Sequence, residues 1–289
     1  KIANPDTMPT IHPTAIVEPG AELAGSVEIG PFCHVGPKVR LGESTRLVGH
    51  VSVMGRTTVG AGNVIWPGAV LGGDPQDLKF KGEDSQLIVG DHNDIRECVT
   101  VHKGTDNDQG FTRIGSHNLI MCYTHIGHDC VLHDHIVIAN NVQLAGHVLM
   151  EDHANIGGSS AAHHFCTIGK FAYVAGLSGV TFDVPPFTFV HGYPACPRKL
   201  NTTLLTRHHF SDERVEALKK AFRMIYGRQG NGEAGVGKSH EALAQLEAEM
   251  SDNADVMDLV QFVRRSGQSV HGRYRESLRR DSVFQNPVR

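Results

Sequence analysis

The sequence predicts an all-β solenoid, a parallel β-helix of hexapeptide repeats, followed by a smaller α-helical part. The first observation is an aliphatic residue at every sixth position, a period that fits neither an α-helix nor a simple strand. The second is a column of small or β-branched residues four positions after each aliphatic residue. The third is a glycine that often follows the aliphatic residue directly. The aliphatic column runs from Ile11 to Leu71, resumes at Val89, Ile95 and Val101, and continues from Ile114 to Val180.

These columns indicate a triangular coil in which each hexad is one short strand plus a corner. The aliphatic side chain fills the narrow interior, and the small residue lies where the corner leaves no room. Glycine is expected where the chain turns, because it tolerates backbone conformations that other residues avoid. Three hexads close one coil, so residues 18 apart are expected to stack about 4.8 Å apart along the solenoid.

Two segments interrupt the repeats, near residues 73–86 and 102–113, and predict loops that leave the solenoid. Glycine, proline and charged residues crowd the first segment, as is typical of an irregular excursion. Loops on a rigid repeat often carry function. Pro185 and Pro186 are expected to end the coils near Val184. We therefore predict a β-helix over residues 1–190 and a helical domain over residues 191–289.

Three helices are expected after a connection over residues 191–210. Ser211 precedes two acidic residues, which is typical of a helix N-cap and first turn. The apolar face of this helix consists of Val215, Leu218, Phe222 and Ile225. A second helix is expected after Ser239 and a third after Asn253. The tail beyond Gly267 is Arg-rich and is expected to be solvated; its arginines are Arg273, Arg275, Arg279 and Arg280.

Composition argues against several classes of function. The formal charge of −4 does not suit bulk nucleic-acid binding, and no apolar run approaches the length of a membrane span. Six scattered cysteines without paired spacing favour reduced thiols. Residues 1–190 contain 11 Lys and Arg against 19 Asp and Glu, a net charge of −8. Residues 191–289 contain 16 against 12, a net charge of +4, which suggests an acidic partner.

Two motif matches are rejected. Residues 232–239 match the phosphate-loop pattern GxxxxGK[ST], but that loop follows a buried strand, whereas here two helices are expected to flank it. Residues 201–203 match a glycosylation sequon, but nothing else in the sequence indicates secretion.

Nine histidines lie between His117 and His164. Such a cluster can form a metal site, serve acid–base catalysis or decorate an exposed face. The 18-residue period predicts two neighbouring columns, one with His128, Gly146 and His164 and the next with Asp129, His147 and Phe165. Four other histidines lack any motif and are expected to be surface decoration: His117, His133, His135 and His153.

The predicted neighbours of His128 suit acyl transfer. A hydroxyl that attacks a thioester needs a base with a pKa near neutrality, which imidazole supplies. The backbone N–H of Gly146, with no side chain in the way, can stabilise the resulting oxyanion. Asp129 can hold the imidazole tautomer if the chain turns a corner there, since a regular strand would separate the two side chains.

Five segments resemble the UDP-N-acetylglucosamine acyltransferase family, and the resemblance covers nearly the whole chain. They are GDPQDLK at 73–79, HIGHD at 125–129, ANN at 139–141, LAGH at 144–147 and DVPP at 183–186. The repeats resemble those of hexapeptide-repeat acyltransferases, whose parallel β-helix is left-handed. The resemblance implies transfer of an (R)-3-hydroxyacyl group from acyl carrier protein to the 3-hydroxyl of UDP-N-acetylglucosamine, the first step of lipid A biosynthesis. No cofactor and no metal ion are expected.

The resemblance also assigns roles to individual residues. It implies that His128 is the general base, Asp129 its orienting partner and Gly146 the oxyanion donor. The sugar and phosphate end of the substrate would be lined by Lys79, His125, His147 and His163, with His164 as a further contact. The nucleotide would be held by Gln76, Asp77, Asn201 and Arg207. Because the family's sites lie between subunits of a homotrimer, these residues need not all meet within one chain.

Two positions depart from the family pattern. His164 stands where the family commonly has Gln, and His208 stands where it commonly has Arg. Both positions concern substrate contacts rather than the base. Gly176 lies where family members measure acyl length, and a glycine there predicts a long groove and an acyl chain of about fourteen carbons.

Three other functions remain open on the sequence alone. A zinc lyase of the γ-carbonic-anhydrase type is built on the same solenoid, with imidazoles of neighbouring coils or subunits as metal ligands. A sugar-nucleotide N-acyltransferase of the same pathway carries an extra N-terminal domain, whereas the repeats here begin by Ile11. A non-catalytic trimeric scaffold predicts that His128→Ala changes no activity.

An acidic carrier protein is the expected partner of the basic C-terminal surface, and salt is expected to weaken its binding. That surface comprises Arg198, Lys199, Lys219, Lys220 and Arg223. The expected location is the cytoplasm. Because the chain starts at Lys1 rather than Met, a mitochondrial or plastid matrix location after removal of a transit peptide is the alternative.

Overall fold

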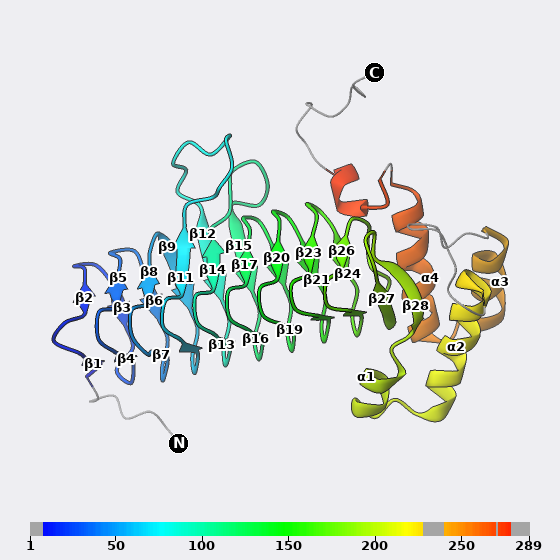
Figure 1. Cartoon of the computed structure of the whole chain (residues 1–289), viewed down its shortest axis with the longest axis horizontal. Helices are drawn as coiled ribbons and strands as arrows, with labels where there is room; N and C mark the ends of the chain where they lie inside the picture. Colours follow the sequence, from blue (N-terminus) through cyan, green and yellow to red (C-terminus); the bar gives the residue numbers. More distant parts are fainter. Residues whose placement is uncertain (1–7, 228–239, 270, 279–289) are drawn as a thin grey trace.

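A computed structural model describes residues 8–227, 240–269 and 271–278. It shows a long stack of coils that carries a helical part at its C-terminal end (Figure 1). The strands form three sheets, and each coil adds one strand to each sheet. Apart from one antiparallel pair at the end, all the strand pairs found in these residues are parallel.

Most strands are two residues long, because a corner follows almost at once. The first sheet contains β1 (Thr10–Ile11), β4 (Glu28–Ile29), β7 (Arg46–Leu47), β10 (Val64–Ile65), β13 (Asp94–Ile95), β16 (Leu119–Ile120), β19 (Val137–Ile138), β22 (Asn155–Ile156), β25 (Tyr173–Val174), β27 (Thr188–His191) and β28 (Cys196–Leu200). The second contains β2 (Ile16–Val17), β5 (His34–Val35), β8 (Ser52–Val53), β11 (Val70–Gly73), β14 (Thr100–His102), β17 (His125–Ile126), β20 (Gln143–Leu144), β23 (Ala161–Ala162) and β26 (Gly179–Val180). The third contains β3 (Glu22–Leu23), β6 (Arg40–Leu41), β9 (Arg56–Val59), β12 (Gln86–Val89), β15 (Phe111–Ile114), β18 (Val131–Leu132), β21 (Leu149–Met150) and β24 (Thr167–Ile168).

The two sequence columns form one continuous core along the coils. Aliphatic residues such as Ile120, Ile126 and Leu132 are fully buried, and so are small-column residues such as Cys130 and Val142. Each buried aliphatic side chain contributes about 1.5–3 kcal/mol of transfer free energy. The predicted interior is therefore confirmed, and the six cysteines are all free thiols, as their spacing predicts.

The corners are turned by residues other than the glycines expected there. The residue three positions after the aliphatic one adopts a left-handed backbone conformation, with φ of +59° at Asp129 and +65° at His147. The glycines that follow the aliphatic residues lie instead where two coils approach. A Cβ on Gly30 would lie 2.0 Å from the carbonyl oxygen of Val48, and one on Gly127 would lie 2.8 Å from the nitrogen of Gly146. The expectation that these glycines relax the turn is wrong, because close contact between coils requires them.

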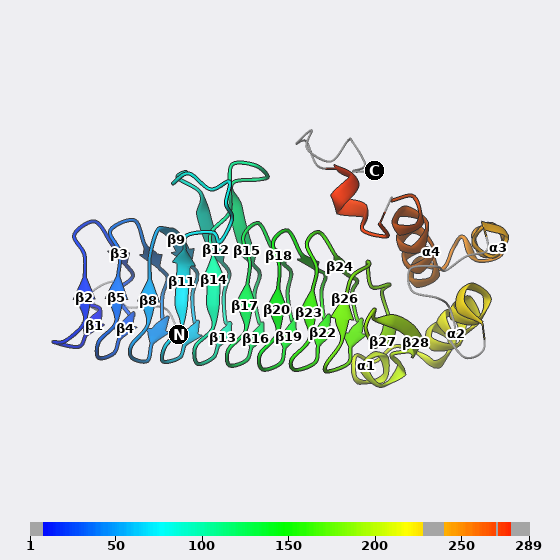
Figure 2. The same cartoon turned by 45° about the horizontal axis from the view of Figure 1, so that its top comes forward.

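Two loops leave the coils on one side of the molecule, as Figures 1 and 2 both show. One spans residues 74–85 between β11 and β12, and the other spans residues 103–110 between β14 and β15. Each follows a strand of the second sheet and leads to a strand of the third. The loops therefore occupy the same corner of two adjacent coils.

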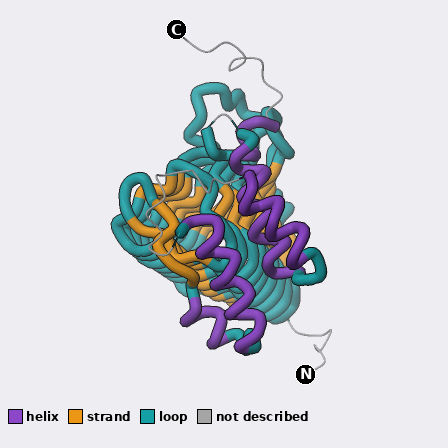
Figure 3. The backbone as a smooth tube through the Cα atoms, turned by 90° about the vertical axis from the view of Figure 1, so that its right-hand side faces the viewer, coloured by secondary structure: helices purple, strands orange, loops and turns teal. Residues whose placement is uncertain are grey.

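The helical part contains α1 (Thr202–Arg207), α2 (Asp212–Tyr226), α3 (His240–Met250), α4 (Ala254–Gly267) and the 3₁₀ helix η1 (Tyr274–Leu278). Ser211 and Asn253 cap α2 and α4 as expected. Seen from the C-terminal end, these helices lie in front of the stacked coils (Figure 3). They form a second core that includes Phe187 and Leu200. No helix of the described residues is both long and apolar enough to cross a bilayer.

Two expectations about this part are wrong, and one segment contains elements that the sequence did not predict. The coils do not end at Val184, because β27 pairs in parallel with β25 beyond the two prolines, which lie at a corner outside the ladder. The 191–210 connection contains β28 and α1. The tail is not merely solvated, since Arg273 donates to the Thr181 carbonyl. The rejected phosphate-loop match at 232–239, and Arg279 and Arg280, lie outside the described residues.

Candidate active site

Most predicted site residues gather at the corner where the chain passes from the second sheet to the third. The loop after β11 carries Gln76, Asp77 and Lys79, and the loop after β14 carries Thr105 and Asp108. The corners after β17, β20 and β23 carry the remaining members, which are His128, Asp129, Gly146, His147, His163 and His164. One edge of the solenoid thus aligns residues that lie far apart in sequence.

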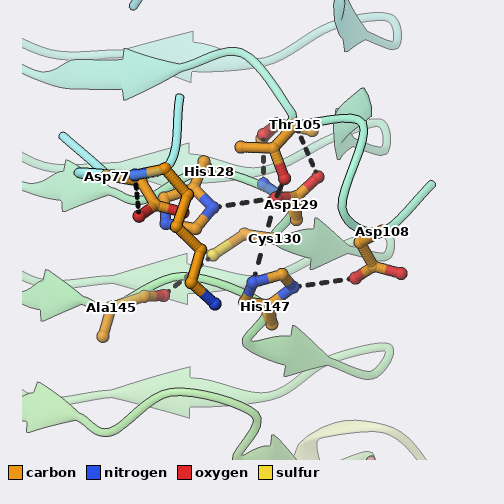
Figure 4. Close-up of polar contacts among 10 residues, drawn as sticks. Asp77, Thr105, Asp108, His128, Asp129, Cys130, Ala145 and His147 are labelled. Atoms are coloured by element: carbon orange, nitrogen blue, oxygen red, sulfur yellow. Dashed lines mark hydrogen bonds and ion pairs between the residues drawn. The ribbon is translucent and has the colours of Figure 1, made fainter. Parts of the chain in front are cut away.

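The Asp129 carboxylate is buried and fully engaged at this corner. It accepts hydrogen bonds from the backbone N–H of Thr105 at 2.8 Å, the Thr105 hydroxyl at 2.7 Å and His128 Nδ1 at 2.8 Å. Its own backbone N–H donates to Thr112 Oγ1 at 2.8 Å. Since the left-handed conformation of Asp129 directs its side chain toward His128, the corner that the sequence requires is present (Figure 4).

The contact with Asp129 fixes the tautomer of His128. A carboxylate only accepts hydrogen bonds, so His128 Nδ1 carries the proton and the lone pair lies on Nε2. The His128 side chain is 10% exposed, so it is buried but not fully enclosed. His128 therefore has the geometry of a base whose orientation is fixed by an acid.

Gly146 lies directly against the His128 ring, as the 18-residue period predicts. A Cβ at this position would lie 2.7 Å from Nε2, so any side chain here would displace the imidazole. The Gly146 carbonyl accepts from the Phe165 N–H, whereas its own N–H makes no hydrogen bond with any described residue. An unused N–H beside a base can stabilise a developing oxyanion.

His147 lies edge to face against His128, with the ring centroids 5.0 Å apart. Its Nδ1 is 2.8 Å from Asp108 Oδ2, its Nε2 is 3.9 Å from Asp129 Oδ2, and its ring stacks on Phe165. Asp108 and Thr105 are site residues that the sequence did not single out, because their loop does not follow the hexad register. Only the departure of residues 102–113 from the repeat could have pointed to them.

His102 is a further residue that the sequence missed, and it forms an imidazole cluster with His125. The two rings meet edge to face at 4.7 Å, and His125 Nδ1 lies 2.8 Å from Thr100 Oγ1. Burial, with a smaller effect of the neighbouring imidazoles, lowers the pKa of His102 to about 4 and lowers the pKa of His125. Both rings are therefore neutral near pH 7, and His102 Nδ1 is buried without a hydrogen-bond partner among the described residues.

A cleft of about 600 Å³ opens beside this corner. Its lining includes Asp77, Lys79, Asp108 and His147, together with the outward side chains of β18 and β21. Arg275 and Leu278 of η1 complete the wall. The cleft thus lies between the two loops, His147 and η1, and it has the size of a small-ligand site.

Of the predicted site residues, Asp77, Lys79 and His147 are the ones found among the described residues that line this cleft. Asn201 and Arg207 line a separate cleft of about 270 Å³ beside the first sheet. Asn201 is buried, caps α1 through Oδ1 and donates to the Phe171 carbonyl. A buried and hydrogen-bonded side chain is a poor acceptor for glycosylation, so the match of residues 201–203 to a sequon is again rejected. His163, His164 and Gly176 are exposed.

Three of the four histidines expected to be decoration stack with His92 at a different corner. His92, His117, His135 and His153 form a column with ring centroids 4.8–5.2 Å apart. All four have positive φ, a conformation in which histidine is enriched among non-glycine residues. Corner geometry therefore gives a structural reason for much of the histidine crowding. His208 packs against His153, away from the Asp129 corner.

His128, Asp129 and His147 could in principle hold a metal ion, since one ligand atom from each lies within 4.8 Å of the others. The Asp129 oxygens, however, already accept three hydrogen bonds, and Nδ1 of His128 uses its proton in one of them. A metal ion would have to replace these bonds.

Comparison with known proteins identifies similar chains. The profile "Udp N-acetylglucosamine O-acyltransferase; Domain 2" matches residues 183–271, and "Bacterial transferase hexapeptide (six repeats)" matches residues 111–146. The acyl-[acyl-carrier-protein]–UDP-N-acetylglucosamine O-acyltransferase of Anaeromyxobacter sp. (strain Fw109-5) is 50% identical, over 88% of this chain and 96% of the relative. The enzyme of the same name from Thiobacillus denitrificans is 49% identical, over 91% and 99%. The solved UDP-N-acetylglucosamine O-acyltransferase of Moraxella catarrhalis has a TM-score of 0.82 and 39% identity, over 88% and 96%.

Proposed function

Because this chain belongs to the acyl-[acyl-carrier-protein]–UDP-N-acetylglucosamine O-acyltransferase family and is an O-acyltransferase, we propose the following reaction and residue roles. An (R)-3-hydroxyacyl group moves from acyl carrier protein to the 3-hydroxyl of UDP-N-acetylglucosamine. The relatives' names supply the donor and the acceptor, and the reaction is the first step of lipid A biosynthesis.

The proposed mechanism uses the lone pair on His128 Nε2. This nitrogen takes the proton of the sugar 3-hydroxyl as the oxygen attacks the thioester carbonyl. The Gly146 N–H stabilises the oxyanion of the tetrahedral intermediate. When the intermediate collapses, the C–S bond breaks and the imidazolium returns its proton to the thiolate of the carrier. Asp129 stabilises the imidazolium between these two steps.

The observation that carries this proposal is the arrangement of His128 between Asp129 and Gly146. Asp129 accepts the hydrogen bond from Nδ1, and Gly146, whose N–H makes no hydrogen bond with any described residue, has no side chain that would crowd Nε2. A zinc ion held by His128, Asp129 and His147 would have to replace the hydrogen bonds that Asp129 accepts, which disfavours this use of the three side chains. The family assignment also favours acyl transfer.

Further parts of the assembly belong to the same proposal. We propose a homotrimer in which Asn201 and Arg207 of one subunit complete the cleft of another, since they lie away from it within one chain. The carrier is proposed to bind the basic surface around Lys199, Lys219 and Lys220. The coil is proposed to be left-handed, and the cytoplasmic location stays a prediction.

The test is a direct assay on purified protein. UDP-N-acetylglucosamine and radiolabelled 3-hydroxyacyl carrier protein should give a labelled 3-O-acyl product without added metal, and a chelator should leave the rate unchanged. Stoichiometric zinc that is lost together with activity would favour the lyase instead. Absence of any O-acyl product with donors of several lengths would refute the proposed reaction.

A further inference from the structure

The segment Gly272–Leu278 docks on the edge of the solenoid that carries the proposed active site. The Asp183 N–H donates to the Gly272 carbonyl at 2.7 Å, and Asp183 Oδ2 accepts from the Tyr274 N–H at 2.9 Å. Asp183 lies after β26, at the corner that follows the second sheet one coil beyond His163 and His164. In Figures 1 and 2 the 3₁₀ helix η1 lies on the same side of the solenoid as the two loops.

Arg273 holds this segment in place. Its guanidinium donates to the Thr181 carbonyl at 2.9 Å and pairs with Glu276 at 2.6 Å. Its side chain is only 11% exposed, so the pair is shielded from water. Together with the two backbone bonds to Asp183, these contacts fix the position of the residue between them, Arg275.

Arg275 differs from Arg273 in having no partner among the described residues. It forms no ion pair and no hydrogen bond there, although it is partly buried and lines the 600 Å³ cleft with Lys79 and His147. Its charge reaches the catalytic corner: burial raises the pKa of the Cys130 thiol to about 12, and the positive charge of Arg275 acts in the opposite direction. A partly desolvated guanidinium without a carboxylate is suited to bind an anion of a ligand.

We propose that Arg275 is a phosphate-binding residue of the active-site cleft, delivered there by the docked segment Gly272–Leu278. The guanidinium matches two phosphate oxygens through paired N–H donors, and Lys79 lines the same cleft. The matched family profile ends at residue 271, so it does not include this residue. The inference rests on the proposed function, which supplies two phosphate esters: the diphosphate of the sugar nucleotide and the phosphodiester of the carrier's phosphopantetheine.

Three variants test this site: Arg275→Gln, Arg275→Lys and, as a control, Arg40→Gln. Arg40 is an exposed arginine that pairs with Glu22 on the N-terminal coils, so its loss changes the net charge equally without touching the cleft. The KM for each substrate is measured with the other substrate saturating. The Kd values for UDP-N-acetylglucosamine and for free 4′-phosphopantetheine are measured by calorimetry on the same proteins.

Arg275→Gln is expected to raise one KM and the matching Kd about tenfold, with kcat changed by less than about threefold. Arg275→Lys should recover most of the lost affinity, and Arg40→Gln should match the wild type. If KM and Kd rise for the sugar nucleotide, Arg275 binds the diphosphate. If they rise for the carrier and its phosphopantetheine, Arg275 binds the phosphate of the phosphopantetheine.

The outcomes separate this site from the reaction itself. Suppose that wild type forms product, but that both KM values and both Kd values of Arg275→Gln stay within about twofold of the wild-type values. The phosphate site is then overturned, whereas the proposed reaction stands. An equal effect of Arg40→Gln overturns it as well. If wild type binds a ligand that Arg275→Gln loses, but forms no product, the reaction is overturned and the site stands. Wild type that binds neither ligand and forms no product overturns both.

Discussion

At the scale of single residues, one buried carboxylate organises the proposed chemistry. Asp129 receives two hydrogen bonds from Thr105 and one from His128, while its backbone N–H is held by Thr112. The 18-residue period could predict that His128 lies against Gly146, because both belong to regular coils. It could not predict Thr105, since the loop that carries it has no fixed register.

Replacement of Asp129 by Asn tests this organising role. An amide nitrogen cannot accept a hydrogen bond, so either Thr105 or His128 loses its acceptor and the proton is free to move to Nε2. We expect kcat to fall about 100-fold or more with a small change in KM, as measured by steady-state assay. Asp134→Asn, at an exposed carboxylate of another corner, should retain wild-type rates. A loss below about threefold in Asp129→Asn would contradict the role.

His102 links the site to pH-dependent stability. Burial lowers its pKa to about 4, whereas the unfolded chain has the ordinary value of 6.5. The unfolded state therefore binds the proton more strongly, and stability is lost as pH falls from 6.5 to 4. Asp183 acts in the opposite sense, because burial raises its pKa to about 6 and its contribution grows as pH falls from 6 toward 4.

Thermal unfolding measured between pH 7 and pH 5 should reveal the contribution of His102 to the pH dependence of stability. His102→Gln should lose less stability than wild type between pH 7 and pH 5, because the titrating imidazole is gone. The control His50→Asn replaces an exposed corner histidine by a residue that also tolerates positive φ. Equal losses in wild type and His102→Gln would show that His102 does not contribute.

At the scale of elements, the hexad repeat predicts the strands and their register, but it does not predict the role of the glycines between them. The aliphatic and small columns form the core as expected. The glycines, however, serve contact between coils rather than the turn, a distinction that needs the distance between Gly30 and Val48. The short elements β27 and η1 escaped prediction because tertiary pairing stabilises them rather than any periodic pattern. The six-residue helix α1, which Asn201 caps, is too short to show a helical period.

Gly176 provides a test at this scale. It is exposed, and a Cβ there would lie 3.2 Å from the Gly158 carbonyl oxygen, so a side chain fits with a small shift. Wild type is expected to prefer acyl chains of about fourteen carbons, and Gly176→Met is expected to favour chains of about ten, because the side chain shortens the groove. Donors of graded length provide the measurement.

The matched control is Gly267→Met, where a Cβ meets no atom within 4 Å, and its length preference should stay that of wild type. A clear preference of the wild type for ten-carbon donors would refute the assignment of Gly176.

At the scale of the whole molecule, the predicted site residues lie in two places. The Asp129 corner carries the residues that we propose as catalytic, whereas Asn201 and Arg207 lie beside the first sheet. The sequence resemblance anticipates such a division, since it implies sites shared between subunits. Periodicity alone could not have revealed it, because Asn201 and Arg207 lie outside the repeats.

Mixed trimers test the shared site. His128→Ala and Arg207→Ala are each expected to be impaired when assayed alone at low substrate concentration. If the site combines His128 of one subunit with Arg207 of another, trimers assembled from both variants should recover about a quarter of wild-type activity. If the mixed trimers are no more active than the mean of the two separate variants, the shared site is contradicted. His128 and Arg207 would then belong to the same subunit's site, or Arg207 would lie outside the site.

The most direct test of the central claim is kcat/KM of His128→Ala for transfer of a 3-hydroxyacyl group to UDP-N-acetylglucosamine. If the imidazole is the base that activates the sugar hydroxyl, this variant should retain the wild-type melting temperature and lose about a thousandfold or more in kcat/KM. A folded His128→Ala protein that keeps kcat/KM within about tenfold of wild type would contradict the claim.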